Sequence, residues 1–130
     1  MSTGIIVFAH GSRVEAANQA VRSAAGDLAR AGGYTVVEAA FLELGTPSLE
    51  DAVEQVIARG VERIVIIPYF LTPGVHLERD LPCIVDRILK NHQGIQVLVT
   101  ASLDGHPGLV EILAERARAV LLSPMHSNNT

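Results

Sequence analysis

Residues 4–9 read Gly-Ile-Ile-Val-Phe-Ala, an uninterrupted apolar run near the start of a 130-residue chain. Runs of this length without polar alternation are typical of strands buried on both faces of a parallel sheet. Residues 63–70 form the longest apolar strand candidate, and residues 95–100 predict a fourth strand. Residues 35–42 also predict a strand, but Glu38 interrupts the run, so we expect this strand at an edge of the sheet.

A helix is predicted between the first two strands. Ser12-Arg13-Val14-Glu15 has the form of a capping box, in which the side chains of Ser12 and Glu15 would bond the free amides of a helix start. Apolar residues then recur at helical spacing until Gly32-Gly33, a pair that is typical of a helix end.

Three more helices follow the other strands. Ser48 is placed to cap one of them. Asp80 is placed to cap the next, over residues 81–90, with Pro82 tolerated in its first turn. Pro107 opens the last helix, which carries an apolar face.

This alternation of strands and helices predicts an α/β fold with a four-stranded parallel sheet and helices on both faces. The two most apolar strands, the first and the third, should lie centrally, which gives the flavodoxin-like strand order 2-1-3-4. We expect a single domain over residues 1–122 and a flexible tail over residues 123–130.

The composition excludes several classes of protein. Lys and Arg number 10 against 14 Asp and Glu, the net charge is −4, and no basic tract indicates a nucleic-acid partner. The start of the chain has no basic segment before its short apolar run, so we expect no signal or membrane helix. The lone cysteine, Cys83, fits a reducing compartment, and we expect a cytoplasmic protein. Charged residues make up only 18% of the chain, which suggests a face shared with another chain.

Titratable residues follow the strands at one edge of this predicted sheet. Ligands of open parallel sheets bind beyond the carboxyl ends of the strands, where the strand order reverses, here between the first and third strands. His10 follows the first strand, His76 lies in the loop after the third, Glu43 ends the second, and Asp104 and His106 follow the fourth. The sequence therefore predicts a site that contains two imidazoles and a carboxylate.

Such a set suits a divalent metal such as cobalt, nickel, iron or zinc, and an imidazole can also accept protons at neutral pH. Simpler interpretations stay open at this point. His10 could bond the neighbouring backbone, His76 could be an exposed loop residue, and Glu43 could be a solvated carboxylate. Ser12 beside His10 could be a nucleophile, but the capping interpretation is favoured, because the surrounding residues are not a G-x-S-x-G elbow.

Other catalytic motifs are missing from the sequence. The chain has no G-x-G-x-x-G, P-loop, H-E-x-x-H or paired C-x-x-C motif, so dinucleotide, nucleoside triphosphate and closed zinc sites have no support. Histidine enzymes that transfer phosphate typically carry Arg before the His-Gly pair, where this chain has Ala9.

Three motifs together resemble a known family. They are Ile-Val-Phe-Ala-His-Gly-Ser at residues 6–12, Ala-Phe-Leu-Glu at 40–43 followed by Pro47-Ser48, and Pro-Tyr-Phe-Leu at 68–71 continuing through Gly-Val-His at 74–76 to Asp-Leu-Pro at 80–82. In this order and spacing they resemble the small CbiX-type class II chelatases, the sirohydrochlorin cobaltochelatases and their ferrochelatase and nickel-chelatase relatives. The resemblance covers nearly the whole chain.

The resemblance implies that His10 and His76 are the metal-binding and catalytic histidines and that Glu43 lines the same cleft. It implies insertion of a divalent metal, Co²⁺ with Fe²⁺ or Ni²⁺ as alternatives, into the tetrapyrrole sirohydrochlorin in cobalamin biosynthesis. The metal would be a substrate, with no tightly bound cofactor. Because longer relatives have two lobes, the family also suggests a homodimer.

The carboxylates of such a substrate would need cationic or N–H partners. Arg13, Arg79 and the helix start near Ser12 are the candidates. Two other functions stay open, namely a metal or tetrapyrrole carrier that uses the same histidines and a phosphoryl-transfer or hydrolytic enzyme that uses His10 and Ser12.

Overall fold

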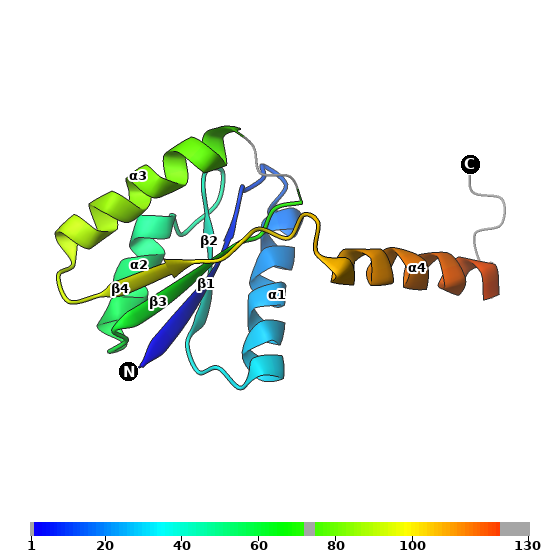
Figure 1. Ribbon diagram of the computed structural model, residues 1–130, viewed down its shortest axis with the longest axis horizontal. Coiled ribbons are helices and arrows are strands. Elements are labelled where there is room, and N and C mark those ends of the chain that lie inside the picture. Colours follow the sequence, from blue (N-terminus) through cyan, green and yellow to red (C-terminus); the bar gives the residue numbers. More distant parts are fainter. Residues whose placement is uncertain (1, 72–74, 123–130) are drawn as a thin grey trace.

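A parallel sheet of four strands lies at the centre of the computed structural model, which describes residues 2–71 and 75–122, without the side chains of 75–77 (Figure 1). The strands lie in the order β2-β1-β3-β4, as the sequence predicts. The elements are β1 (Thr3–Ala9), α1 (Glu15–Gly32), β2 (Val37–Phe41), α2 (Leu49–Ala58), β3 (Arg63–Pro68), α3 (Val75–Asn91), β4 (Gln96–Val99) and α4 (Pro107–Leu122).

The strand β1 is buried because it pairs on both sides. Ile5 is opposite Val37 of β2 and Val65 of β3, and all residues from Gly4 to Ala9 are buried. The strand β2 pairs with β1 only, which confirms the prediction that it lies at an edge. An apolar run therefore marks a central strand, as the physics of a doubly covered sheet requires.

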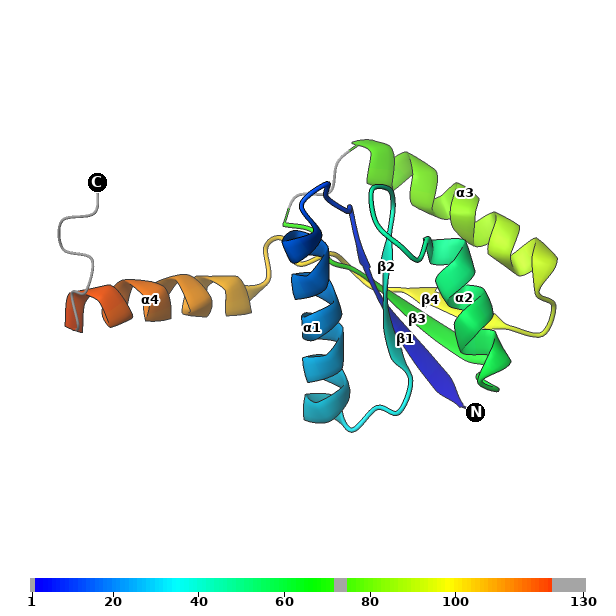
Figure 2. The ribbon, with the colours of Figure 1, turned by 180° about the vertical axis from the view of Figure 1, so that it is seen from behind.

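Helices cover both faces of the sheet (Figures 1 and 2). On one face, α2 and α3 pack on a core that includes Ile6, Phe8 and Ile66. On the other face, α1 packs on a smaller core that includes Val7 and Phe41. This division follows because parallel crossover connections are right-handed. The chain moves across the sheet in one direction from β1 to β2 and in the opposite direction from β2 through β3 to β4, so the connecting helices lie on opposite faces.

The start of α1 corrects the predicted capping box. The cap position of α1 is Val14, which has no side chain that could accept an amide hydrogen bond. The hydroxyl of Ser12 instead accepts a hydrogen bond from the Val14 N–H at 3.0 Å, a turn two residues long that precedes the helix. The predicted end of α1 is confirmed, because Gly33 adopts a left-handed conformation with φ of 68°.

The other caps divide in the same way. Ser48 caps α2 as predicted, since its hydroxyl accepts the Asp51 N–H at 3.2 Å. Asp80 does not cap α3, because the helix begins earlier, at Val75, and places Pro82 inside it. Pro82 is exposed and lacks an N–H, so the helix continues past it with one fewer intrahelical bond, and the buried residues Leu81 and Ile88 hold it on the core.

The helix α4 departs from the expectation that each helix packs on the sheet. It points away from the body of the domain in both views, and none of its residues is buried (Figures 1 and 2). None of the helices in residues 2–71 and 75–122 has both the length and the apolar composition that a membrane crossing needs. The predicted tail, 123–130, lies outside the described residues.

Candidate functional site

The sheet brings His10 and Glu43 together at its carboxyl edge. His10 follows β1 and Glu43 follows β2, and the His10 Nε2 atom lies 3.6 Å from Glu43 Oε1. The segments that follow β1 and β2 continue side by side past the end of the sheet, because the Glu43 N–H donates to the His10 carbonyl at 3.0 Å. Both side chains are about half exposed, with 54% and 58% of their surfaces accessible, so they can meet a ligand from solvent.

The ring of His10 is oriented by its neighbours. Its Nδ1 lies 3.3 Å from the Gly11 carbonyl, and the ring edge meets Phe70, whose centroid is 6.4 Å away at an interplanar angle of 80°. With the proton on Nδ1, this backbone contact leaves the lone pair of Nε2 directed to the Glu43 side. The backbone bond that is the simpler interpretation of His10 is thus compatible with metal binding through the other nitrogen.

A cavity of about 280 Å³ opens beside this pair and is lined by His10, Leu42, Glu43 and Asp80. Asp80 comes from α3, so three elements contribute titratable groups to one cavity. The sequence reasoning missed Asp80 because it assigned the residue to a helix cap. Its position four residues after His76, one helical turn, is the signal that could have found it.

Gly11 permits the close approach of the two loops. Its φ is +96°, and a Cβ built on it would lie 1.6 Å from the Glu43 carbonyl oxygen. A side chain at this position would therefore push the loop of Glu43 away from the loop of His10.

Asn18 on α1 joins the two loops by hydrogen bonds and is a residue that the sequence reasoning missed. It is 97% buried, and its side chain accepts from the Ser12 N–H at 2.9 Å and donates to the Ser12 and Leu44 carbonyls at 2.8 and 3.0 Å. These bonds join the loop that follows His10 to the loop that follows Glu43. A polar residue among the buried positions of α1, with Val21 and Ala25, was the available signal.

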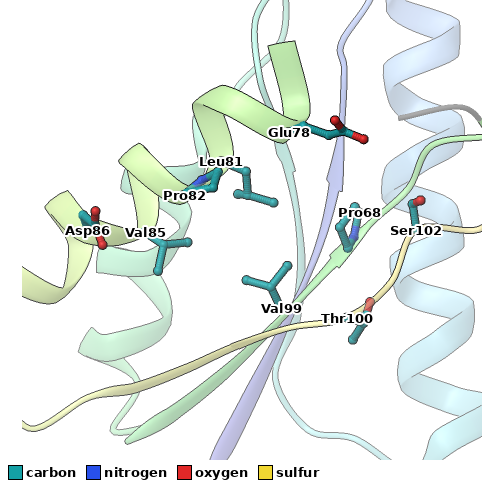
Figure 3. A pocket seen from close by; sticks show the side chains of 9 residues that line it. All are labelled: Pro68, Glu78, Leu81, Pro82, Val85, Asp86, Val99, Thr100 and Ser102. Carbon is teal, nitrogen blue, oxygen red and sulfur yellow. The ribbon is translucent and has the colours of Figure 1, made fainter. Parts of the chain in front are cut away.

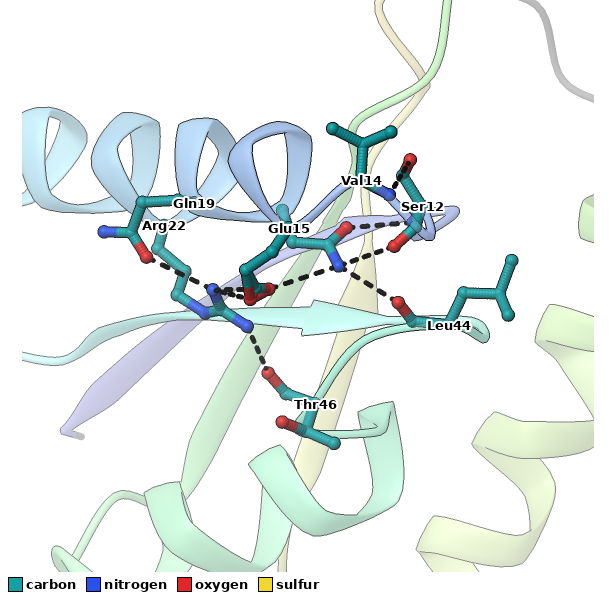
Figure 4. A network of polar contacts seen from close by, with 8 residues as sticks. Ser12, Val14, Glu15, Gln19, Arg22, Leu44 and Thr46 are labelled. Atoms are coloured by element: carbon teal, nitrogen blue, oxygen red, sulfur yellow. Dashed lines mark hydrogen bonds and ion pairs between the residues drawn. The ribbon is translucent and has the colours of Figure 1, made fainter.

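Arg22 extends this network one turn further along α1 (Figure 4). Its guanidinium donates to the Thr46 carbonyl at 3.0 Å and contacts Glu15 at 3.3 Å. It also lies over the Phe41 ring, 5.2 Å from the centroid. The loop between β2 and α2 is therefore held to α1 at two places.

The other residues that the sequence predicts for the site lie either near the carboxyl edge of the sheet or in the loop before α4. Arg13 and Arg79 are exposed, and the described part of His76 is its backbone, in the first turn of α3. The side chain of His76 lies outside what the structure describes. His106 has a local role, since its Nδ1 accepts the Gly108 N–H at 2.9 Å at the start of α4, and Asp104 accepts a bond from Ser102.

Among the described side chains, no three His, Cys, Asp or Glu groups form a ready metal centre. The arrangement supplies one imidazole nitrogen and one carboxylate, with Asp80 across the cavity. An ion at this place would keep open coordination positions, which a reaction on the ion requires and a closed structural site lacks.

A second hollow lies between α3 and β4 (Figure 3). It has a volume of about 430 Å³, and apolar residues such as Leu81, Val85 and Val99 line it. Among the described residues that line it, Glu78 and Asp86 are the charged ones. The described part of its lining is mainly apolar and carries two carboxylates, which suits an apolar molecule better than an anionic one.

A doubly wound parallel sheet with an imidazole and a carboxylate at the point where its strand order reverses defines the class, an α/β domain with its ligand site at the carboxyl edge. The chain belongs to the CbiX family, whose model matches residues 4–120.

Two relatives share its sequence over different lengths. The chain is 35% identical over 118 residues to a chloroplastic sirohydrochlorin ferrochelatase from Arabidopsis thaliana, with 91% of this chain and 52% of the relative covered. It is 37% identical over 78 residues to a sirohydrochlorin cobaltochelatase from Methanopyrus kandleri, with 60% and 54% covered. The chain thus spans about half the length of these relatives.

A solved structure confirms the fold. A cobalamin (vitamin B12) biosynthesis CbiX protein from Marinobacter aquaeolei is 27% identical and superposes with a TM-score of 0.73, covering 92% of this chain and 97% of the other.

Proposed function

We propose that this chain is a sirohydrochlorin chelatase that inserts a divalent metal ion, Co²⁺, into its tetrapyrrole in cobalamin biosynthesis. The observation that carries the proposal is the His10–Glu43 pair, 3.6 Å apart at the carboxyl edge of a CbiX-family sheet. The names of the relatives, sirohydrochlorin cobaltochelatase and ferrochelatase, supply the substrate.

Metal insertion has three requirements that residues of this edge can meet. The ion must lose bound water, two pyrrole N–H protons must leave as the ion enters, and the substrate carboxylates must be held. Nε2 of His10, with His76, would hold the ion and leave positions open for pyrrole nitrogens. Glu43, or a histidine, would accept the departing protons.

His76 is included because it precedes Asp80 by one helical turn, and Asp80 lines the cavity of His10 and Glu43. Arg13 and Arg79 are exposed cations that can bind the substrate carboxylates. The N–H of Ser12 already donates to Asn18, and its hydroxyl already accepts from Val14, so Ser12 would contribute only its hydroxyl proton.

The choice of metal is the finer part of this proposal. Imidazole and carboxylate ligands accept cobalt, nickel and iron, and affinity rises from Fe²⁺ through Co²⁺ to Ni²⁺ in any such site. Binding strength therefore does not decide the substrate. Initial rates of insertion with Co²⁺, Ni²⁺ and Fe²⁺, measured without oxygen, identify the substrate metal. We expect the highest rate with Co²⁺.

A spectroscopic insertion assay tests the proposed reaction. We expect turnover of sirohydrochlorin with Co²⁺ by the unaltered chain, a loss of about 100-fold or more in His10→Ala and His76→Ala, and little change in Ser12→Ala. His92→Ala, at the opposite end of α3, is the control. Binding of both substrates without turnover would identify a carrier instead. Loss of activity in Ser12→Ala with retention in His76→Ala would support a hydrolytic or phosphoryl-transfer enzyme.

A further inference from the structure

Leu44 combines a strained backbone with an exposed apolar side chain directly after Glu43. Its φ is 57°, and among residues 2–71 and 75–122 it is the one residue other than glycine with a positive φ. This left-handed conformation is costly for leucine, because its Cβ comes close to the following carbonyl oxygen. Leu44 is also 50% exposed. Neither feature stabilises the fold, and strained residues of this kind gather at functional sites.

A network of hydrogen bonds holds Leu44 in this conformation. The buried amide of Asn18 donates to the Leu44 carbonyl at 3.0 Å. The residues on both sides are fixed as well, because the Glu43 N–H is bonded to the loop that follows β1 and Arg22 donates to the Thr46 carbonyl at 3.0 Å. The Leu44 carbonyl therefore points to α1, and its side chain extends away from that helix (Figure 4).

Other exposed apolar side chains lie in the loops at the same edge of the sheet. Val14, after β1, is 63% exposed, and Tyr69 and Leu71, after β3, are 41% and 63% exposed. The ring of Phe70, between the last two, contacts the ring of His10. The loops that follow β1, β2 and β3 thus each place an exposed apolar side chain at the edge that carries the imidazole–carboxylate pair.

The cavity beside His10 and Glu43 is too small to enclose a tetrapyrrole. Its volume is about 280 Å³. Pockets that enclose a drug-sized ligand have volumes of roughly 300–1,000 Å³. A metal ion can enter the cavity, but a flat ring of four pyrroles must lie across its mouth for the ring nitrogens to reach the ion. The faces of such a ring are apolar, so apolar side chains beside the mouth are suited to contact them.

We propose that Leu44 is a binding residue for the apolar face of the macrocycle and that Asn18 holds it in the strained conformation that presents its side chain. The inference rests on the proposed function, which supplies the tetrapyrrole. An exposed leucine gains free energy when the ring covers it, and a loop that is already fixed loses little entropy on binding. The strain lowers the stability of the free protein, a common trade between stability and function.

Leu44→Asn separates binding from stability. Asparagine tolerates a positive φ better than leucine does, and its side chain is polar. We therefore expect the urea midpoint to rise. The dissociation constant for metal-free sirohydrochlorin, titrated spectroscopically without oxygen, should increase by about tenfold or more. Leu44→Met keeps an apolar side chain of similar size, so it should bind within about twofold of the unaltered chain and leave the urea midpoint unchanged.

Leu89→Asn is the matched control. Leu89 is 40% exposed and lies in the last turn of α3, at the opposite end of this helix from Asp80 and the cavity. Asparagine forms helices less readily than leucine, so this substitution should lower the urea midpoint. It should leave the affinity for sirohydrochlorin unchanged. One substitution at two exposed leucines should thus shift stability in opposite directions and weaken binding at Leu44 alone.

The outcomes distinguish this inference from the proposed function. An unaltered chain that does not bind sirohydrochlorin would overturn both. Equal binding by the unaltered chain and by Leu44→Asn would overturn the inference and leave the proposed reaction standing. A lower urea midpoint for Leu44→Asn would contradict the strained conformation. A lower mass of Leu44→Asn in light scattering, with full affinity for sirohydrochlorin, would assign Leu44 to a contact between copies of the chain and overturn its role in binding.

Discussion

The carbonyl oxygen of Glu43 occupies the space in which a side chain on Gly11 would begin, 1.6 Å from the position of that Cβ. The two residues follow different strands and are 32 positions apart in the sequence, as their numbers show. Their contact is what places His10 and Glu43 within reach of one ion, so the site depends on the smallest residue in the chain.

Gly11→Ala should therefore destabilise the protein more than an ordinary glycine substitution. The new Cβ would overlap the Glu43 backbone, and the alanine would have to adopt a φ of +96°. Together these two effects should lower the free energy of unfolding by about 3 kcal/mol or more. Gly33→Ala is the matched control, because Gly33 also has a positive φ but has no atom within 4 Å of its Cβ position, so about 1 kcal/mol is expected. Urea unfolding measures both, and equal losses would show that the close approach does not matter.

Asn18 should be required for the stability of both loops. Asn18→Ala leaves the Ser12 N–H and two carbonyls without their partner in a buried place, at a cost of about 2–4 kcal/mol. Asn18→Asp has the same shape but sets a carboxylate against the Ser12 and Leu44 carbonyls, so it should be at least as damaging. Gln19→Ala, on the exposed side of α1, should change the unfolding free energy by less than about 0.5 kcal/mol. A tolerated Asn18→Asp would contradict the donor role of the amide.

The two serines near helix starts should differ in their contribution. Ser48→Ala removes a true cap, the bond to the Asp51 N–H, and should cost about 1 kcal/mol. Ser12→Ala removes a turn bond at an exposed position and should cost less than half as much, about 0.5 kcal/mol or less. Thermal or urea unfolding of the two variants checks the order, and a larger loss for Ser12→Ala would restore the capping box that the structure argues against.

Glu43 should matter for metal binding and hardly at all for stability. The His10–Glu43 pair is more than half exposed on both sides, and exposed pairs stabilise a fold by less than about 1 kcal/mol. Glu43→Gln should leave the unfolding curve nearly unchanged while it weakens Co²⁺ binding by about tenfold, measured by calorimetry.

Glu50→Gln is the control for Glu43→Gln. Glu50 accepts a 2.9 Å bond from Arg87, which raises the pKa of that guanidinium, and it lies outside the cavity of His10. The substitution Glu50→Gln should therefore leave Co²⁺ binding unchanged. Equal Co²⁺ affinities in the Glu43 and Glu50 variants would exclude Glu43 from the metal site.

Much of the fold follows from residues that act locally. The apolar run 4–9 is buried on both faces and becomes a central strand, whereas β2, whose run Glu38 interrupts, lies at the edge. The hand of parallel crossovers then decides which face each of the first three helices covers. His10 and Glu43 came together as predicted, because the carboxyl ends of parallel strands share one edge.

The errors arose where a motif that spacing predicts lost its groups to other contacts in the folded chain. Ser12 and Glu15 match a capping box, yet Asn18 takes the Ser12 backbone and Arg22 takes Glu15, so the cap does not form. Asp80 matches a helix start, yet α3 begins five residues earlier and turns Asp80 to the cavity. Neither competition is visible from spacing, because the winning contacts depend on where the loops meet.

The sequence by itself thus determined the order of the strands and the edge at which the chemistry lies, since both follow from apolar periodicity and chain direction. Only the tertiary structure decided that Asn18 holds the two loops together, that Asp80 lines the cavity and that α4 points away from its own sheet. Those outcomes depend on contacts between segments far apart in the chain, whose energies no local pattern records.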